Sequence, residues 1–176
     1  DPGGSALDED EAFKKFNPAF MGLLGAPNVL TGTDMQSYAD FALALEYPPN
    51  PVRALNDVLT TDQSAGQDVF VNHPADGGSI ACNTCHDLPT GTDGLSTFEG
   101  EPQSFKVAHL RNMYTKVGMF QVPGKQVRGF GFLHDGGVST LNLFVQANVF
   151  SLSTTQEAQL EQFMRAFDTG HKPAVG

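Results

Sequence analysis

Between residues 59 and 72 the apolar positions follow a helical spacing. Three apolar residues share one face of such a helix: Ala65, Val69 and Phe70. Thr60 or Thr61 is suited to cap its N-terminus, because a threonine hydroxyl can accept a hydrogen bond from a backbone N–H of the first turn. Gly66 has no side chain and leaves room for a second helix to come close. The pattern predicts a helix that packs tightly on another element.

A second amphipathic segment covers residues 153–170. Its apolar residues recur at i, i+3, i+4 and i+7, which is one face of a helix: Leu160, Phe163, Met164 and Phe167. The segment begins with serine and threonine residues, which favour a helix start, and Gly170 is expected to stop the helix. Residues 59–72 and 153–170 therefore predict two helices at the ends of one domain.

The N-terminal part of the chain contains two more segments with helical patterns. Residues 8–25 and residues 33–51 are both expected to be helices, the second capped by Thr33 and ended by the Pro-Pro-Asn-Pro sequence at 48–51. Strands are expected at most as a short pair around residues 127–133. The sequence thus predicts an all-α protein, with an N-terminal helical extension and linker at 1–50 and a second domain at 51–176.

Composition and charge exclude several classes of partner. The 176 residues carry a formal net charge of −10, which disfavours binding to nucleic acid or to an anionic membrane surface and favours a basic protein or a neutral surface as partner. No apolar run approaches the roughly 18 residues of a membrane helix. The chain begins without an initiator methionine, which favours a processed protein or a piece of a larger one.

The chain contains only two cysteines, Cys82 and Cys85, and His86 follows them directly. A dithiol redox pair would need a thiol activated at a helix N-terminus after a strand, whereas the preceding residues read as a loop. A zinc site would need four ligands, and no second cysteine pair supplies them. The Cys-x-x-Cys-His pattern fits covalent haem attachment best, because each thiol can add across a haem vinyl group. We therefore expect one haem c, held by Cys82 and Cys85, with His86 as the proximal iron ligand.

A second iron ligand in such a site is usually a methionine or a histidine. Met164 lies on the apolar stripe of the last helix and is expected to be a core residue. Met113 and Met119 remain downstream of the motif. Met119 follows a glycine in a loop that can approach the haem face, so the metal ligands are predicted to be His86 and Met119, with Met113 as the alternative.

The segment from Phe105 to Val145 resembles the haem domains of the bacterial di-haem cytochrome c peroxidase superfamily. The matching positions form Phe-Lys-Val, Leu-Arg-Asn and His-Asp-Gly motifs and include Phe105, Leu110, Arg111, Asn112, His134, Asp135 and Gly136. The resemblance covers about residues 50–170 and is closest to single-haem domains at the C-terminal ends of larger secreted proteins. It implies a cytochrome c fold and export to the periplasm or the extracellular space. Unlike the peroxidases, this chain has one haem motif, and a longer segment separates its Leu-Arg-Asn and His-Asp-Gly elements.

Four further polar residues are candidates for contact with the cofactor. Arg111 and Arg128 can each pair with a haem propionate, because a guanidinium group binds a carboxylate in a bidentate manner; the alternative is a surface arginine. His109 and His134 are expected to be structural, with ligation or a hydrogen bond to a propionate as the alternative.

These observations favour an electron-transfer protein over an enzyme. The expected function is one-electron exchange through a single haem c with His/Met ligation, as the C-terminal module of a larger exported protein. Its partner would be a basic redox protein or another domain of the parent protein. The alternatives are a peroxidase-like enzyme or a gas sensor with a labile sixth ligand, and a colourless domain built on zinc or a disulfide.

Overall fold

The computed structural model describes residues 8–98, 103–117, 131–133 and 136–174. Its chain divides into two compact units, Asp1–Glu46 and Tyr47–Gly176. The sequence places the corresponding boundary after residue 50.

The first unit contains three helices: α1 (Glu9–Lys14), α2 (Asn17–Gly22) and α3 (Gly32–Leu43). The sequence predicts a single helix over 8–25, but the structure divides it into α1 and α2. Pro18 is in the first turn of α2 and has no N–H, so it cannot extend the hydrogen-bond ladder of α1. Proline is tolerated in the first turn of a new helix, and the helix therefore begins again there.

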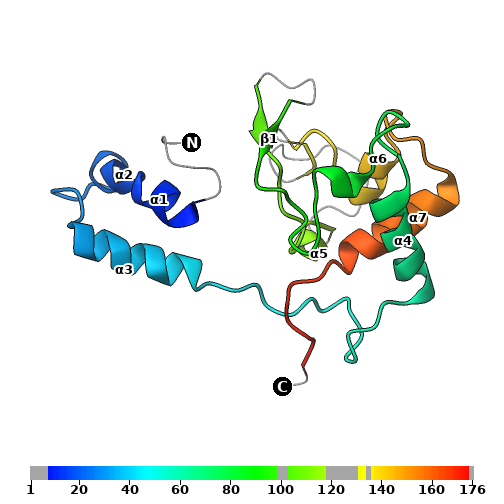
Figure 1. Cartoon of the computed structure of the whole chain (residues 1–176), viewed down its shortest axis with the longest axis horizontal. Coiled ribbons are helices and arrows are strands. Elements are labelled where there is room, and N and C mark those ends of the chain that lie inside the picture. Colours follow the sequence, from blue (N-terminus) through cyan, green and yellow to red (C-terminus); the bar gives the residue numbers. More distant parts are fainter. Residues whose placement is uncertain (1–7, 99–102, 118–130, 134–135, 175–176) are drawn as a thin grey trace. The chain divides into compact units, whose positions relative to one another are not determined.

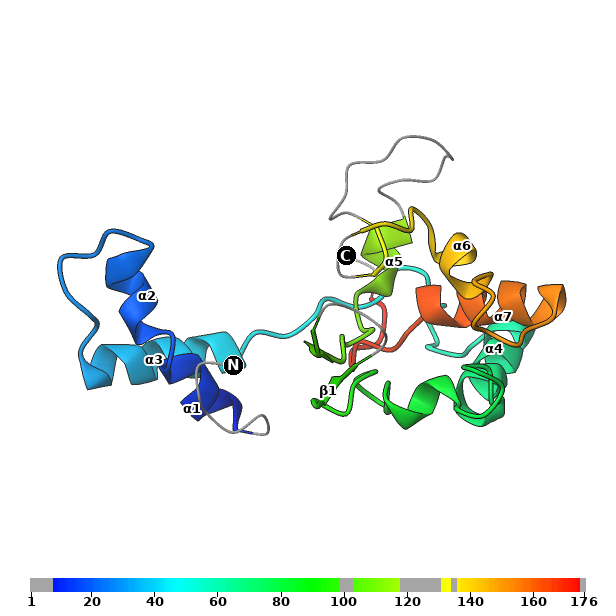
Figure 2. The ribbon, with the colours of Figure 1, turned by 90° about the horizontal axis from the view of Figure 1, so that it is seen from above.

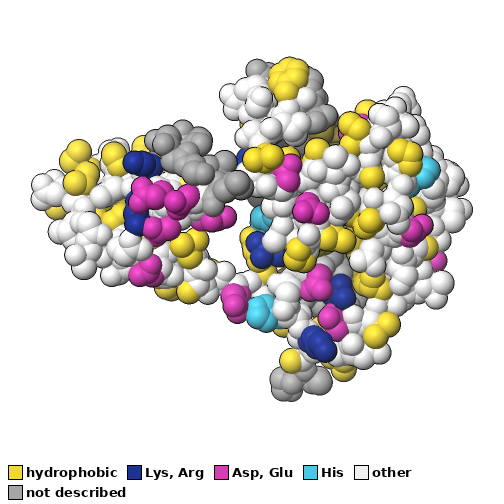
Figure 3. All heavy atoms as spheres, in the orientation of Figure 1, with side chains coloured by type: hydrophobic (Ala, Val, Ile, Leu, Met, Phe, Trp, Pro, Cys, Tyr) yellow, Lys and Arg dark blue, Asp and Glu magenta, His cyan; other side chains and the backbone are white. Residues whose placement is uncertain are grey.

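Helix α3 begins earlier than expected, because Thr31 rather than Thr33 is its cap. The Thr31 side chain accepts a hydrogen bond from the backbone N–H of Asp34. Three aromatic rings surround Tyr38 within this unit, with centroid distances of 5.3, 5.5 and 6.4 Å: Phe13, Phe20 and Phe41. Figure 3 shows acidic side chains gathered on the surface of this unit, beside exposed hydrophobic ones.

In the second unit, helices α4 (Thr61–Asn72) and α7 (Thr154–Arg165) lie side by side (Figures 1 and 2). The shorter elements are the 3₁₀ helix η1 (Cys82–Thr84) and the helices α5 (Met113–Val117) and α6 (Leu141–Val145). Each of the two long helices starts with a capping box, made by Thr60 with Gln63 and by Ser153 with Gln156. Within the described ranges no helix combines the length and the apolar character needed to cross a membrane.

Gly66 is the point of close approach between α4 and α7. A Cβ atom at this position would lie 1.9 Å from the Gln159 carbonyl oxygen and 2.9 Å from the Phe163 Cβ. Next to it, Phe70 packs on Phe163 and Phe167 at ring-centroid distances of 5.3 and 6.0 Å. All four members of the predicted stripe on α7 are buried: Leu160, Phe163, Met164 and Phe167. The predicted helix pair and the role of Gly66 are confirmed.

We expect Gly66→Ala to lower the free energy of unfolding by about 1–3 kcal/mol, measured by urea titration. The new methyl group meets backbone rather than a flexible side chain, so α4 and α7 must move apart. This cost exceeds the gain of roughly 1 kcal/mol that alanine brings over glycine in a helix. Ser64→Ala, at an exposed position of the same helix, is the control and should change stability by less than about 0.5 kcal/mol. Equal stability of Gly66→Ala and the unmodified protein would contradict the close packing.

The all-α prediction is wrong. Strand β1 (Ser96–Thr97) pairs with β2 (Phe105–Lys106) in an antiparallel two-stranded sheet. Isolated bridges add short strand-like contacts, among them Phe132 with Val138. The fold is therefore mixed, with helices and a small sheet. Two-residue strands have no alternating pattern long enough to be recognised in a sequence, which explains the error.

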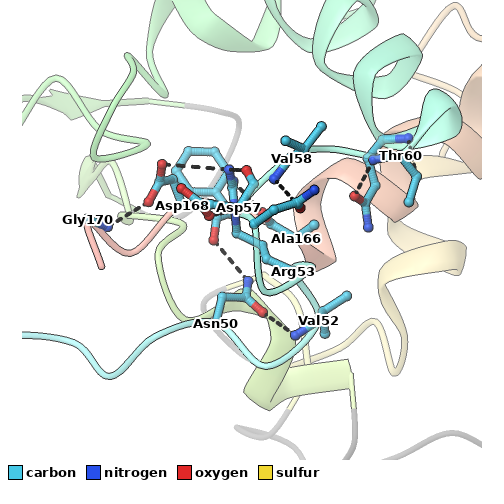
Figure 4. A network of polar contacts seen from close by, with 12 residues as sticks. Asn50, Val52, Arg53, Asp57, Val58, Thr60, Ala166, Asp168 and Gly170 are labelled. Carbon is cyan, nitrogen blue, oxygen red and sulfur yellow. Dashed lines mark hydrogen bonds and ion pairs between the residues drawn. The ribbon is translucent and has the colours of Figure 1, made fainter. Parts of the chain in front are cut away.

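The segment before α4 is attached to the end of α7 (Figure 4). Asn50 is fully buried, and its side-chain amide donates to the carbonyls of Arg165 and Phe167, both at 2.9 Å. The Arg53 guanidinium donates to the carbonyl of Ala166 at 3.1 Å. The last carbonyls of a helix have no partner within it, so these side chains satisfy groups that would otherwise be buried without a hydrogen bond.

Helix α7 ends before the glycine that was expected to stop it. The helix finishes at Arg165. There the side chains of Asn50 and Arg53 donate hydrogen bonds to the carbonyls of Arg165 and Ala166. Gly170 lies further along in a turn with φ +86°, where its N–H donates to the Asp168 carboxylate. The positive φ does require glycine, but for this turn and not for the helix end.

Candidate functional site

The Cys-x-x-Cys-His motif forms a tight turn in the second unit. Cys82 begins η1, and its carbonyl accepts hydrogen bonds from the backbone N–H groups of Cys85 and His86. Both cysteines are half-buried, and no disulfide joins them. The turn brings the side chains of all three residues to the wall of one cavity.

This cavity has a volume of about 430 Å³, within the range of small-molecule and cofactor sites. Most of its wall is apolar and comes from segments far apart in the sequence. The apolar part of the wall includes Phe70, Ile80, Phe105, Val107, Leu110, Leu133, Val138, Phe144, Val145, Val149, Phe150, Leu160 and Met164. Besides the motif, the polar side chains on the wall are those of Asp76, Thr97 and Lys106. Such a cavity suits a large apolar ligand that the motif can bind.

Two backbone carbonyls fix the orientation of the His86 ring. Its Nδ1 lies 2.9 Å from the carbonyl oxygen of Gly91 and 3.1 Å from that of Ala108. A carbonyl only accepts hydrogen bonds, so Nδ1 carries the proton and donates. The imidazole is then the tautomer whose Nε2 lone pair can bind a metal.

A loop contact holds these carbonyls in place. Gly91 has φ +74°, and a Cβ atom there would lie 2.7 Å from the Leu110 Cβ. The N–H of Leu110 donates to the carbonyl of Thr90 at 3.3 Å, and the Thr92 hydroxyl donates to the carbonyl of Val107 at 2.6 Å. The loop after the motif and the segment around residue 108 therefore form one support for His86.

Comparison with known proteins adds no assignment. No family model, curated protein or solved structure matches this chain.

The surroundings of Cys82 argue against a redox-active dithiol. Burial raises the pKa of its thiol above the usual range, and the Asp76 carboxylate adds to the rise. Redox-active cysteines have a lowered pKa, because the thiolate is the reactive form. A neutral thiol on an apolar wall suits a cysteine that packs against a ligand.

A metal site built from protein ligands alone is not found in the described part of the chain. There, no group of three or more His, Cys, Asp or Glu side chains could hold a metal ion. A structural zinc site needs four such ligands.

The methionines occupy different positions relative to the cavity. Met119, the predicted second ligand, lies outside the described residues. Met113 is buried in the core and is not on the cavity wall. Met164 is buried and does contribute to that wall. Among the described residues, Met164 is thus better placed for contact with a ligand than Met113.

Some residues of the segment that resembles the peroxidase superfamily line the cavity, and others do not. Phe105 and Leu110 line the cavity, whereas Arg111 does not and places its guanidinium over the ring of Tyr47. Arg128, His134 and Asp135 lie outside the described residues. The structure therefore brings Cys82, Cys85 and His86 to the same cavity wall as two apolar residues of that segment, Phe105 and Leu110.

A covalently attached haem fits the residues that are present. Its macrocycle requires an apolar cavity, its vinyl groups require two nearby thiols, and its iron requires an imidazole nitrogen. The cavity wall supplies all three kinds of group. The residues that sequence reasoning missed are Gly91 and Ala108, which act through backbone carbonyls. Only Gly91 gave a signal, since glycine often marks a left-handed backbone position.

Proposed function

We propose that this protein binds one haem c covalently and transfers electrons. The observation that carries the proposal is the apolar cavity whose wall contains both cysteines and the oriented His86. Cys82 and Cys85 provide the two thioether sulfurs, and His86 Nε2 provides the proximal ligand. Bound haem supplies one-electron chemistry, since its iron alternates between the ferrous and ferric states.

The chain's own residues position this chemistry and protect it. The carbonyls of Gly91 and Ala108 hold the His86 ring and increase its basicity by accepting from Nδ1. The apolar wall, including Phe70 and Leu160, excludes water from the ligand. Low polarity around such a centre is one of the factors that set its reduction potential.

Met119 is proposed as the second axial ligand, and Arg128, like Arg111, as a propionate partner. We also propose that the resemblance to the di-haem peroxidase superfamily reflects a shared haem-binding motif, and that the protein works in the periplasm or outside the cell. Its partner is proposed to be a basic redox protein or another domain of its parent protein.

The experiment that tests this function compares electron exchange with peroxide turnover. With Met119 bound, carbon monoxide should bind the reduced protein slowly or not at all, and peroxide turnover should be negligible, since both need a vacant sixth position. Electron exchange with a basic small redox protein should be fast and should slow about tenfold or more as salt rises, because salt screens the net charge of −10. Stopped-flow absorbance measures all three rates. Fast carbon monoxide binding with sustained peroxide turnover would favour the enzyme instead.

A further inference from the structure

A second group of polar side chains lies beside the cavity wall and consists of Tyr47, His109 and Arg111. The Tyr47 hydroxyl is 2.7 Å from His109 Nε2, and the two rings lie 5.0 Å apart between centroids. The Arg111 guanidinium carbon lies 4.8 Å from the centroid of the Tyr47 ring. This Tyr-His-Arg cluster brings two nitrogen-rich side chains together around one aromatic ring.

Two buried nitrogen atoms of the cluster have no hydrogen-bond partner among the residues that the structure describes. They are His109 Nδ1 and Arg111 Nε. Burial and the charge of Arg111 lower the pKa of His109, so its imidazole is neutral at pH 7. The Tyr47 hydroxyl can donate to Nε2, and the ring proton then lies on Nδ1, which becomes a second unpaired donor.

Burying a hydrogen-bond donor without a partner is unfavourable, and more so when the donor is charged. Among the described residues, no carboxylate forms an ion pair with Arg111. Two unpaired N–H donors, one of them on a cation, are suited to a carboxylate, which only accepts hydrogen bonds. The missing acceptor is therefore expected to be an anion with two oxygens.

The cluster's position relates it to the cavity. Val107, Ala108 and Leu110 line the cavity, and His109 and Arg111 belong to the same segment without lining it. A haem carries two carboxylates on an otherwise apolar ring, and burying a carboxylate against an apolar wall without a partner is unfavourable. Hydrogen-bond donors beside the apolar lining would suit its propionates.

We propose that His109 Nδ1 and Arg111 Nε together bind a propionate of the haem. This inference rests on the proposed function, because it needs a haem in the cavity. It adds a role for His109, which sequence reasoning expected to be structural, and it makes His109 and Arg111 one site. Tyr47 positions the site: its hydroxyl fixes the tautomer of His109, and its ring carries the guanidinium.

The test uses the haem-loaded full chain and its resonance Raman spectrum, in which the propionate bending band reports hydrogen bonds to the carboxylates. His109→Leu and Arg111→Gln should each move this band to lower wavenumber, whereas His109→Asn, which keeps an N–H donor, should move it less. His73→Leu is the matched control, since His73 bonds to the Ser151 carbonyl and is absent from the cavity wall. Arg111→Gln should also lower the reduction potential, because a positive charge near the haem favours the reduced state.

The outcomes separate the possible acceptors. If no variant moves the band although all remain folded by circular dichroism, the cluster only packs and the proposal is wrong. A free carboxylate as acceptor would instead make the melting temperature of the unmodified protein rise with sodium acetate, but not that of His109→Leu, with an unchanged Raman band. This result would also overturn the propionate assignment. A purified chain whose mass shows no haem would refute the proposed function itself, before any variant is compared.

Discussion

The protein made in a cell with a haem-maturation system should keep its haem through acid–acetone extraction. Its mass should exceed that of the bare polypeptide by one haem, because two thioether bonds at Cys82 and Cys85 do not dissociate on denaturation. The two thiols lie on the wall of the same cavity as His86, so one macrocycle can meet all three groups. Replacing both cysteines by alanine should abolish the haem retained after extraction.

The control for this experiment changes the same turn without its thiols. Ser79 and Thr84 are exposed residues of this region, and Thr84 lies between the two cysteines. A chain carrying Ser79→Ala and Thr84→Ala should therefore keep its full complement of haem. A colourless unmodified protein with the mass of the polypeptide alone would rule out covalent attachment.

The two long helices could be predicted because their signals are local. Thr60 and Ser153 precede clear apolar stripes, and each has a glutamine three residues later that completes a capping box. Gly66 predicted the contact between the helices, since a missing side chain on a buried face implies a close neighbour. Periodicity and capping chemistry were sufficient here.

The two-stranded sheet and the break between α1 and α2 could not be predicted from the hydrophobic pattern. Strands β1 and β2 have two residues each, and their pairing depends on contacts across a loop rather than on a pattern within either strand. The break did have a local signal in Pro18, but the apolar positions on both sides of it continue at helical spacing. The hydrophobic pattern alone therefore predicts one continuous helix in place of α1 and α2, and it does not predict the sheet.

In the candidate site, too, some residues could be predicted from the sequence and others could not. Cys82, Cys85 and His86 could be selected because few chemistries need those residue types at that spacing. The groups that orient His86 could not be predicted from the sequence. Every residue has a backbone carbonyl, and only the fold determines that those of Gly91 and Ala108 contact His86. Likewise, the unpaired nitrogens of His109 and Arg111 become visible only when their burial is known.

Loss of the second axial ligand is expected to change the spectrum and the reduction potential of the haem strongly. Met119→Ala should convert the ferric haem from low spin to high spin and lower the reduction potential, because a thioether ligand stabilises the reduced state. The reduced variant should also bind carbon monoxide quickly, since its sixth position is open. Visible spectroscopy and a redox titration measure these changes.

Met164 is the decisive comparison, because it contributes to the cavity wall and is buried in α7. Met164→Leu keeps nearly the same volume, so it should cost less than about 1.5 kcal/mol of stability and leave the low-spin spectrum intact. Met113→Leu, at a core position away from the wall, should behave in the same way. If Met164→Leu gives the high-spin spectrum while Met119→Ala does not, the ligand comes from α7, and the apolar stripe of that helix serves both the core and the iron.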